Sequence, residues 1–163
     1  MGTIVDITTS LDGFVAGPNP TLEDPLGEGG ERLHEWAVAL EAFRECHGME
    51  GGETSADSER LRESVDATGA VVMGRRMFSG GEGPWDTDPN ADGWWGDDPP
   101  FKAGLVDELR LHLAPILLGS GTRLLDDLGD VELERTAVID SPGVTHVTFR
   151  VVKYQVLALG RIR

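Results

Sequence analysis

Three strand-like runs in the second half of the chain restrict it to a fold that contains a sheet. In "ELRLHLA", residues 108–114, every second residue from 109 to 113 is leucine and the residues between are polar, which is typical of a strand with one buried face. Residues 131–139 and 144–156 are two more such runs, and "DSPG" between them is typical of a turn. The sequence therefore predicts a strand that ends at Pro115 and, after it, an antiparallel C-terminal hairpin.

The first half alternates strand and helix patterns. Residues 2–10 are rich in β-branched side chains and predict a strand. Apolar residues at steps of three and four over 31–47 predict one helix, and 55–69 predict a second helix that stops at Gly69. Residues 70–73 form a short apolar run that predicts a strand covered on both faces. This order indicates an α/β fold with a mostly parallel central sheet and an antiparallel C-terminal hairpin.

The composition excludes several classes of partner. The 163 residues include 29 acidic and 14 basic side chains, a balance that repels nucleic acid and anionic membranes. No apolar run approaches the roughly 20 residues that span a bilayer. Cys46 is the one cysteine, and residues 1–10 do not resemble a signal peptide. We expect a single cytoplasmic domain over residues 1–163.

The stretch "AVVMGRRMFS" is the first candidate binding site. A strand that ends at Gly74 before a helix start would present free backbone N–H groups, which attract anions. Arg75 and Arg76 carry guanidinium groups that match a phosphate, and Ser79 adds a hydroxyl. The alternative is that both arginines pair with neighbouring acidic residues, and the spacing favours neither interpretation.

"SLDGFVAG" is the second candidate. Gly13 and Gly17 would let a ligand approach the backbone, and Asp12 offers a carboxylate. Asp-Gly is nevertheless more often a plain turn. Trp36 has the same ambiguity, because it can line a pocket or belong to the core on the helical spacing of Leu33 and Leu40.

Other kinds of site find no support in the sequence. His34, Cys46 and His47 match no structural zinc pattern, so we expect no metal site. A nucleophile elbow, a phosphate-binding Walker loop and a dinucleotide fingerprint are also missing.

Four motifs, "TTSLDGFVAGPN", "GAVVMGRRMF", "GWWGDDPPF" and "AGLVDELRLHLAPILLGSG", occur in the order found in a known family. With them the chain resembles the dihydrofolate-reductase-like family, and in particular the C-terminal reductase domain of the riboflavin biosynthesis deaminase-reductase and its stand-alone bacterial relatives. The resemblance implies a three-layer dihydrofolate-reductase-like sandwich. It also implies a homodimer that uses NADPH to reduce a pyrimidine or pterin-like heterocycle, such as the ribosylamino-uracil of riboflavin synthesis.

The same resemblance implies the site residues. Those expected to hold NADPH are Val15, Ala16, Gly17, Met73, Gly74, Arg75, Arg76 and Ser79. Those expected to meet the substrate are Asp12, Gly13, Phe14 and Trp36. In such a reductase the cofactor supplies the chemistry and the protein positions the reacting groups.

The chain departs from the family between Phe101 and Lys102. Relatives carry at this point a strand, a helix and another strand followed by a glycine pair that contacts the cofactor, whereas here Phe101 is followed directly by Lys102. The alternative function is therefore a non-catalytic dimeric binding or scaffold protein that keeps the reductase fold.

Overall fold

The computed structural model describes residues 2–21, 24–71, 105–126 and 131–152, and the account of the structure concerns these residues. In chain order the elements are strand β1 (Ile4–Ser10), strand β2 (Phe14–Ala16), 3₁₀ helix η1 (Gly30–Leu33), helix α1 (Glu35–Val38), helix α2 (Glu41–Cys46), helix α3 (Ala56–Ala67), strand β3 (Glu108–Ala114), strand β4 (Thr122–Arg123), strand β5 (Glu132–Ser141) and strand β6 (Val144–Val152). None of the described helices is long and apolar enough to cross a membrane.

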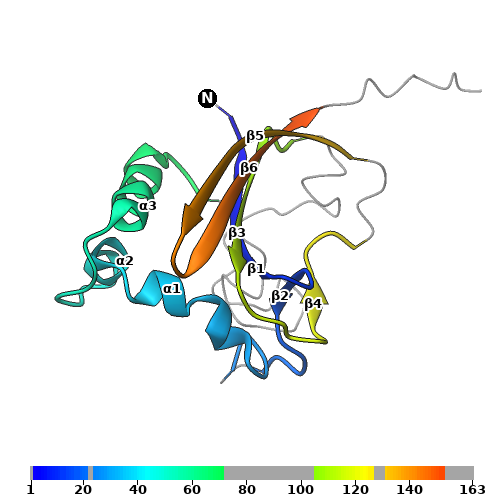
Figure 1. Ribbon diagram of the computed structural model, residues 1–163, viewed down its shortest axis with the longest axis horizontal. Coiled ribbons are helices and arrows are strands. Elements are labelled where there is room, and N and C mark those ends of the chain that lie inside the picture. The colour runs from blue at the N-terminus through cyan, green and yellow to red at the C-terminus, as the bar shows by residue number, and fades with distance from the viewer. Residues whose placement is uncertain (1, 22–23, 72–104, 127–130, 153–163) are drawn as a thin grey trace, which may run out of the picture.

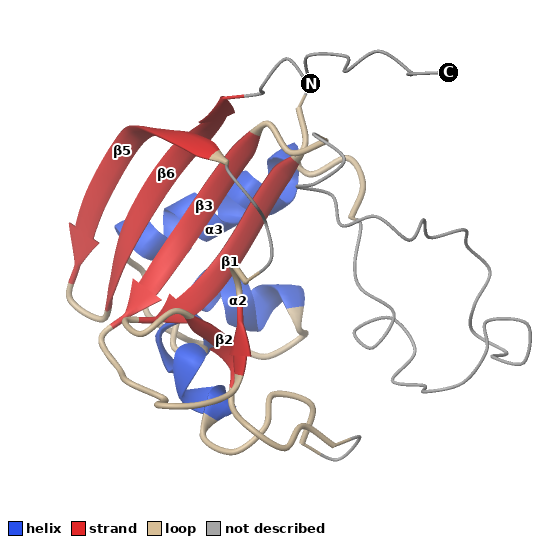
Figure 2. Cartoon of the chain, turned by 90° about the vertical axis from the view of Figure 1, so that its right-hand side faces the viewer, coloured by secondary structure: helices blue, strands red, loops and turns tan. Residues whose placement is uncertain are grey.

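A four-stranded sheet in the order β1-β3-β6-β5 forms the centre of the described structure (Figure 2). Strand β1 pairs with β3 in parallel, and the other two pairings, β3 with β6 and β5 with β6, are antiparallel. The predicted first strand, the strand that ends before Pro115 and the C-terminal hairpin are confirmed. The described part of the sheet is mixed, however, and not mostly parallel, because one of its three pairings is parallel.

The described helices α1, α2 and α3 lie on one side of the sheet (Figure 1). The α/β class is therefore confirmed, whereas the three-layer sandwich stays a prediction. The short two-stranded sheet β2-β4 lies beside the end of β1 (Figure 1). The predicted strand over 70–73 lies in part outside the described residues, and its described residues 70 and 71 are not in a strand. The break between Phe101 and Lys102 also lies outside the described residues.

The single helix predicted over residues 31–47 is wrong, because the structure has three short helical pieces there. The chain is extended at Leu40, with φ −75° and ψ 140°, and this residue forms a bridge with Glu53. The Glu53 N–H donates to the Ala39 carbonyl at 2.8 Å, and the Glu41 N–H donates to the Glu53 carbonyl at 3.0 Å. These bonds with a distant segment replace the helical bonds that the periodic pattern alone would predict.

The second predicted helix is confirmed as α3, although its end differs from the prediction. The Ser55 hydroxyl accepts a hydrogen bond from the Ser58 N–H and so caps the start of the helix. At the other end Thr68 has extended backbone, with φ −82° and ψ 110°. The helix therefore ends before Gly69 and does not use a left-handed glycine there.

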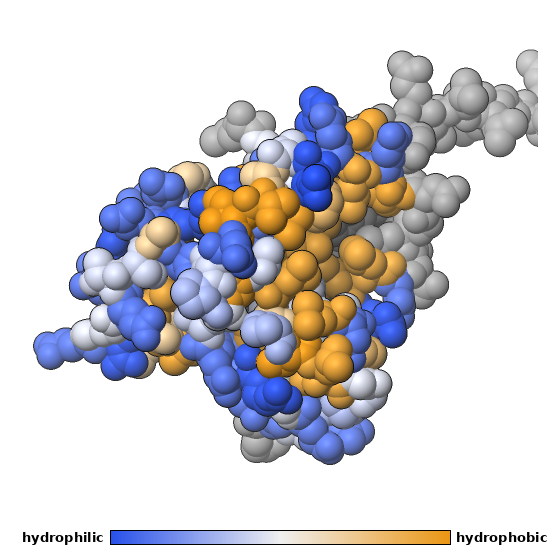
Figure 3. All heavy atoms as spheres, in the orientation of Figure 1, coloured by the Kyte–Doolittle hydropathy of each residue, from blue (hydrophilic) through white to orange (hydrophobic). Residues whose placement is uncertain are grey.

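Strand β3 buries Leu109, and the polar side of the sheet is also partly covered. Leu109 in β3 is fully buried, as are Val106 before this strand and Leu33 in η1. His146 in β6 is only 5% exposed although it lies on the opposite face from the leucines. The sequence predicted one buried face for β3, and the helices cover part of the other. In the view of Figure 3 the apolar side chains gather over the strands and the hydrophilic ones over the helices.

Candidate functional site

The carboxyl ends of β1 and β3 lie side by side and bring two loops together. The register of this parallel pair places Ser10 opposite Ala114, so residues 11–17 and residues 115–123 leave the sheet at the same edge. We refer to these two segments as the carboxyl edge. Open α/β sheets bind their ligands beside the carboxyl ends of parallel strands. This edge is therefore the first place at which to look for a ligand site.

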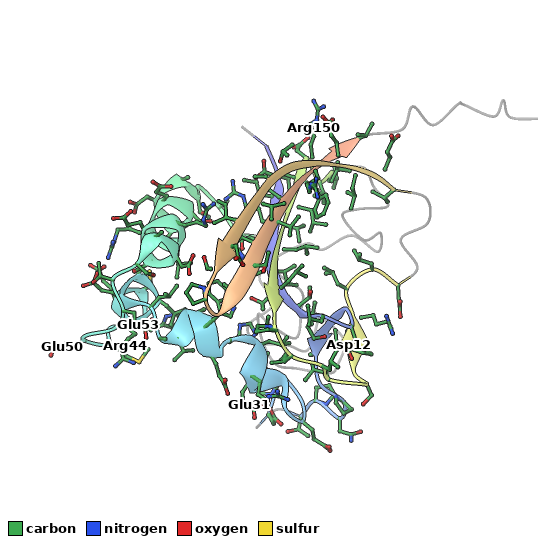
Figure 4. The ribbon with its side chains drawn as sticks, in the orientation of Figure 1. Asp12, Glu31, Arg44, Glu50, Glu53 and Arg150 are labelled. Carbon is green, nitrogen blue, oxygen red and sulfur yellow. The ribbon has the colours of Figure 1, made fainter. Side chains whose placement is uncertain are left out.

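Asp12 fastens the two loops of the carboxyl edge to each other. Its carboxylate accepts hydrogen bonds from the Gly119 N–H at 2.7 Å and from the Leu118 N–H at 3.2 Å. The Ser10 hydroxyl donates to the same carboxylate at 2.6 Å. The Ser10 hydrogen bond and these backbone donors lower the pKa of Asp12 to about 2. Asp12 is therefore ionised at neutral pH. Figure 4 shows it beside β2 and far from Arg150.

Gly13 and Phe14 follow Asp12 in a tight turn. Gly13 has φ +84°, a conformation that favours glycine, and its N–H donates to the Ser10 carbonyl at 3.0 Å. Phe14 is buried, and the guanidinium carbon of Arg123 lies 4.6 Å from the centre of its ring. Arg123 is exposed, so it places a positive charge at the carboxyl edge. The sequence analysis did not select Arg123.

Val15 and Ala16 lie in β2, and Gly17 follows them where two segments of backbone cross. A Cβ atom on Gly17 would lie 2.1 Å from the Glu28 carbonyl oxygen, and one on Gly121 would lie 2.0 Å from the Ala16 carbonyl oxygen. The close approach that the sequence predicts at Gly17 is therefore an approach of the chain to itself. The cofactor-binding roles of Val15, Ala16 and Gly17 stay predictions.

The remaining predicted cofactor residues, which are Met73, Gly74, Arg75, Arg76 and Ser79, lie outside the described residues. Their cofactor-binding roles stay predictions.

Trp36 lines a second feature, a hollow between the helices and the polar face of the sheet. Its empty volume is about 460 Å³, part of which is open to solvent. The charged and aromatic residues around it are Asp6, Trp36, Asp57, Arg60, Arg110, His112 and His146. Of the four residues predicted to meet the substrate, only Trp36 lies at this hollow.

A continuous chain of hydrogen bonds crosses the wall of the hollow. His112 Nε2 lies 2.5 Å from Asp6 Oδ1, and His112 Nδ1 lies 2.6 Å from His146 Nδ1. His146 Nε2 lies 3.1 Å from Asp57 Oδ1, which also accepts from the Ser141 hydroxyl at 2.6 Å. We refer to Asp6, His112, His146 and Asp57 as the histidine chain. It joins β1, β3, β6 and α3.

Trp36 packs against both imidazoles of the histidine chain. Its ring centre lies 5.1 Å from that of His112 and 5.4 Å from that of His146. The Trp36 Nε1 atom is buried and has no hydrogen-bond partner among the described residues. Because this N–H has no contact with solvent, a molecule in the hollow cannot bond to it in this conformation.

The charges in the histidine chain shift the pKa values of its members. Burial lowers the pKa of His146, and so does the neighbouring charge of His112, while Asp57 opposes both. Burial acts to raise the pKa of Asp6, but the hydrogen bond and charge of His112 and the charge of Arg110 outweigh it, so the pKa of Asp6 is lowered. Asp6 is therefore ionised at neutral pH.

The sequence patterns do not predict this chain of side chains. In the sequence, His112 is one of the polar residues that alternate with leucine, and none of the motifs includes His146. One signal could have indicated the two histidines. Both lie in strands that the sequence predicts, on the face of the sheet that the leucines of β3 do not occupy. Their pairing could not be seen without the register that places His112 opposite His146. Among the described residues, no three His, Cys, Asp or Glu side chains are arranged to hold a metal ion.

One protein family matches part of the chain. Residues 100–153 match the family model of the RibD C-terminal domain. The resemblance that the sequence motifs indicate is confirmed for this segment, which contains β3, β4, β5 and β6.

Two further comparisons add little. No curated protein matches the chain. Among the solved structures, a protein of Shewanella sp. PV-4 provisionally assigned to riboflavin biosynthesis is 16% identical, with a TM-score of 0.46, over 94% of this chain and 100% of that one. A likeness of this degree is too slight to carry an argument.

Proposed function

We propose that the protein is an NADPH-dependent reductase of a small heterocycle of the pyrimidine or pterin class. The observation that carries the proposal is the match of residues 100–153 to the RibD C-terminal domain, a family that generally binds NADPH. The ribosylamino-uracil of riboflavin synthesis is the first substrate to try. The "SLDGFVAG" and "VVMGRRMF" motifs support the same function from outside the matched segment.

The carboxyl edge supports the proposal with features that suit an anionic dinucleotide. Arg123 supplies a positive charge there. Gly119 has φ +76°, and a Cβ atom at its position would meet nothing within 4 Å, so its Cα is open to an approaching ligand while its N–H is bonded to Asp12. Asp12 is saturated by the Gly119 and Leu118 N–H groups, which limits its repulsion of a phosphate. The described residues therefore fit part of such a site.

When bound, NADPH supplies a hydride, and the residues of the protein bind and orient the two reactants. Arg75 and Arg76 would hold the ribose phosphate, because two guanidinium forks match its oxygens and an otherwise acidic chain needs such a local charge. The hydrogen bonds of Asp12 would keep the loop of residues 11–17 in one position while the substrate binds.

NADPH binding to the full chain, measured by isothermal titration calorimetry, tests the function. Wild-type protein should bind NADPH, and the double variant Arg75→Ala/Arg76→Ala should lose at least tenfold in affinity. The matched control is Arg32→Ala/Arg44→Ala, which removes two charges from the helices and should bind as wild type. Equal affinity of the arginine variant and the control would remove the phosphate-binding role of Arg75 and Arg76.

A non-catalytic dimeric protein is the second candidate, and the strand β5 favours it. This ten-residue strand lies at the edge of the described sheet, and its Val138 is 51% exposed. Such an edge is open to pairing with a second copy of the chain. A stable dimer that binds neither NADPH nor NADH would favour this function over the reductase.

A further inference from the structure

The histidine chain contains three donor–acceptor contacts, which we call gaps, and each needs one proton to become a hydrogen bond. Two neutral histidines supply only two N–H protons. Three gaps connect its four members: Asp6 to His112, His112 to His146, and His146 to Asp57. Ionised carboxylates only accept hydrogen bonds, so each end gap needs a proton on the facing imidazole nitrogen. The central gap needs one proton between the two Nδ1 atoms. Three protons are required, whereas two neutral imidazoles bring two.

The two neutral histidines therefore leave one gap without a proton. The unfilled gap would place two lone pairs opposite each other: between the Nδ1 atoms 2.6 Å apart, between His112 Nε2 and the Asp6 carboxylate, or between His146 Nε2 and the Asp57 carboxylate. Two charged histidines are also excluded, because both Nδ1 atoms would then carry hydrogens that point at each other. One additional proton, shared by the pair, satisfies every gap.

We propose that the histidine chain binds a single additional proton at neutral pH and that this proton fastens helix α3 to the sheet. Asp57 belongs to α3 and the other three members belong to β1, β3 and β6, so the chain links the helix to three strands of the sheet. The Ser141 hydroxyl, which also bonds to Asp57, adds a link to β5. Loss of the proton removes one of the three bonds and so weakens the link between α3 and the sheet.

The surroundings of His112 and His146 favour one additional proton on the two imidazoles and disfavour a second. His146 is 5% exposed and the His112 side chain 13%, so both imidazoles interact strongly with their neighbours. The charged groups that line the hollow with them are Asp6 from β1, Arg110 from β3, and Asp57 and Arg60 from α3. The two carboxylates are in direct contact with the imidazoles and attract one positive charge. Arg60 and the first charge oppose another.

The predicted effect on stability has a maximum. Unfolded histidines titrate near about pH 6.5. Above that pH the unfolded chain has lost both protons while the folded chain keeps one, so stability falls as the pH rises. Below it the unfolded pair binds two protons and the folded pair only one, since the pKa of His146 is lowered, so stability falls as the pH falls. The contribution of the pair is therefore greatest near pH 6.5.

Nitrogen NMR of the full chain with ¹⁵N-labelled histidine tests the proton count directly. At neutral pH we expect both Nε2 atoms to be protonated and a single proton between the two Nδ1 atoms. A His47→Gln variant, which removes an exposed histidine, helps to assign the signals and should leave this pattern unchanged. An unprotonated Nε2 on either His112 or His146 at neutral pH would overturn the proposal.

Urea unfolding from pH 5 to pH 8 supplies the second readout. The midpoint of wild type and of His47→Gln should decline on both sides of about pH 6.5. In His146→Gln the decline above that pH should be lost, because glutamine cannot take up the proton. Parallel profiles of His146→Gln and wild type would contradict the proposal. If His146→Gln does not fold, the nitrogen NMR of wild type still decides the proton count.

Discussion

The carboxyl edge and the histidine chain both hold carboxylates in fixed hydrogen bonds, but the donors differ. At the carboxyl edge Asp12 accepts from two backbone N–H groups, which do not titrate. In the histidine chain Asp6 and Asp57 face imidazoles, which change charge near neutral pH. The carboxyl edge should therefore keep its shape over the physiological pH range, whereas the histidine chain should respond to a change of pH.

The largest effect on stability is expected from a substitution that disrupts the backbone of the carboxyl edge. In Gly121→Ala the new Cβ atom would lie 2.0 Å from the Ala16 carbonyl oxygen, at a residue with φ +135°. Backbone strain and overlap together should lower the free energy of unfolding by about 3 kcal/mol or more. Urea unfolding measures the loss.

Gly119→Ala is the matched control for this prediction. Gly119 also has a positive φ, +76°, but a Cβ atom there meets nothing within 4 Å. The cost should be only about 1 kcal/mol, from the left-handed conformation alone. Equal losses in the two variants would show that the crossing of the two loops does not hold the carboxyl edge together.

A smaller effect is expected on the helical side. Ser58 is fully buried in α3, and its hydroxyl accepts a hydrogen bond from the Ala42 N–H of α2 at 3.0 Å. Ser58→Ala leaves this N–H buried without a partner, which should cost about 1–2 kcal/mol in the free energy of unfolding. The exposed Ser120→Ala should change it by less than about 0.5 kcal/mol. If both variants unfold alike, side-chain bonds do not fasten the helices as described.

The smallest effect is expected at Asp12, because its exposure to solvent weakens the contribution of its charge to the stability of the fold. The folded pKa of about 2 lies below the unfolded value of 3.8, so the charge stabilises the fold above pH 3.8 and this stability is lost as the pH falls toward 2. Asp12→Asn should therefore melt below wild type at pH 7, and the difference should shrink between pH 4 and pH 2. The melting temperature measures it, with the exposed Asp126→Asn as control. A difference that is unchanged at pH 2 would contradict the assignment.

Half of the described elements, namely β1, α3, β3, β5 and β6, could be predicted from the sequence because their local patterns agree with the final packing. The alternation in β3 is an example. The helix over 31–47 could not be predicted correctly, because the extended backbone at Leu40 results from pairing with Glu53, a partner 13 positions away. Local periodicity contains no information about such a partner.

The candidate site was only partly predictable for a similar reason. "SLDG" indicated both a turn and a ligand loop, and the structure contains the turn while the ligand role stays a prediction. The bonds from Asp12 to Leu118 and Gly119 span more than 100 residues and depend on the parallel pairing of β1 with β3. The contact between His112 and His146 depends in the same way on register. Spacing along the chain does not give either contact.

The most direct test of the proposed reductase is the choice between the two nicotinamide cofactors. Calorimetric titration of the wild-type chain should give saturable binding of NADPH at least tenfold tighter than that of NADH, because only NADPH carries the ribose phosphate that Arg75 and Arg76 would hold. Absence of saturable NADPH binding, or equal affinity for the two cofactors, would contradict the proposed function.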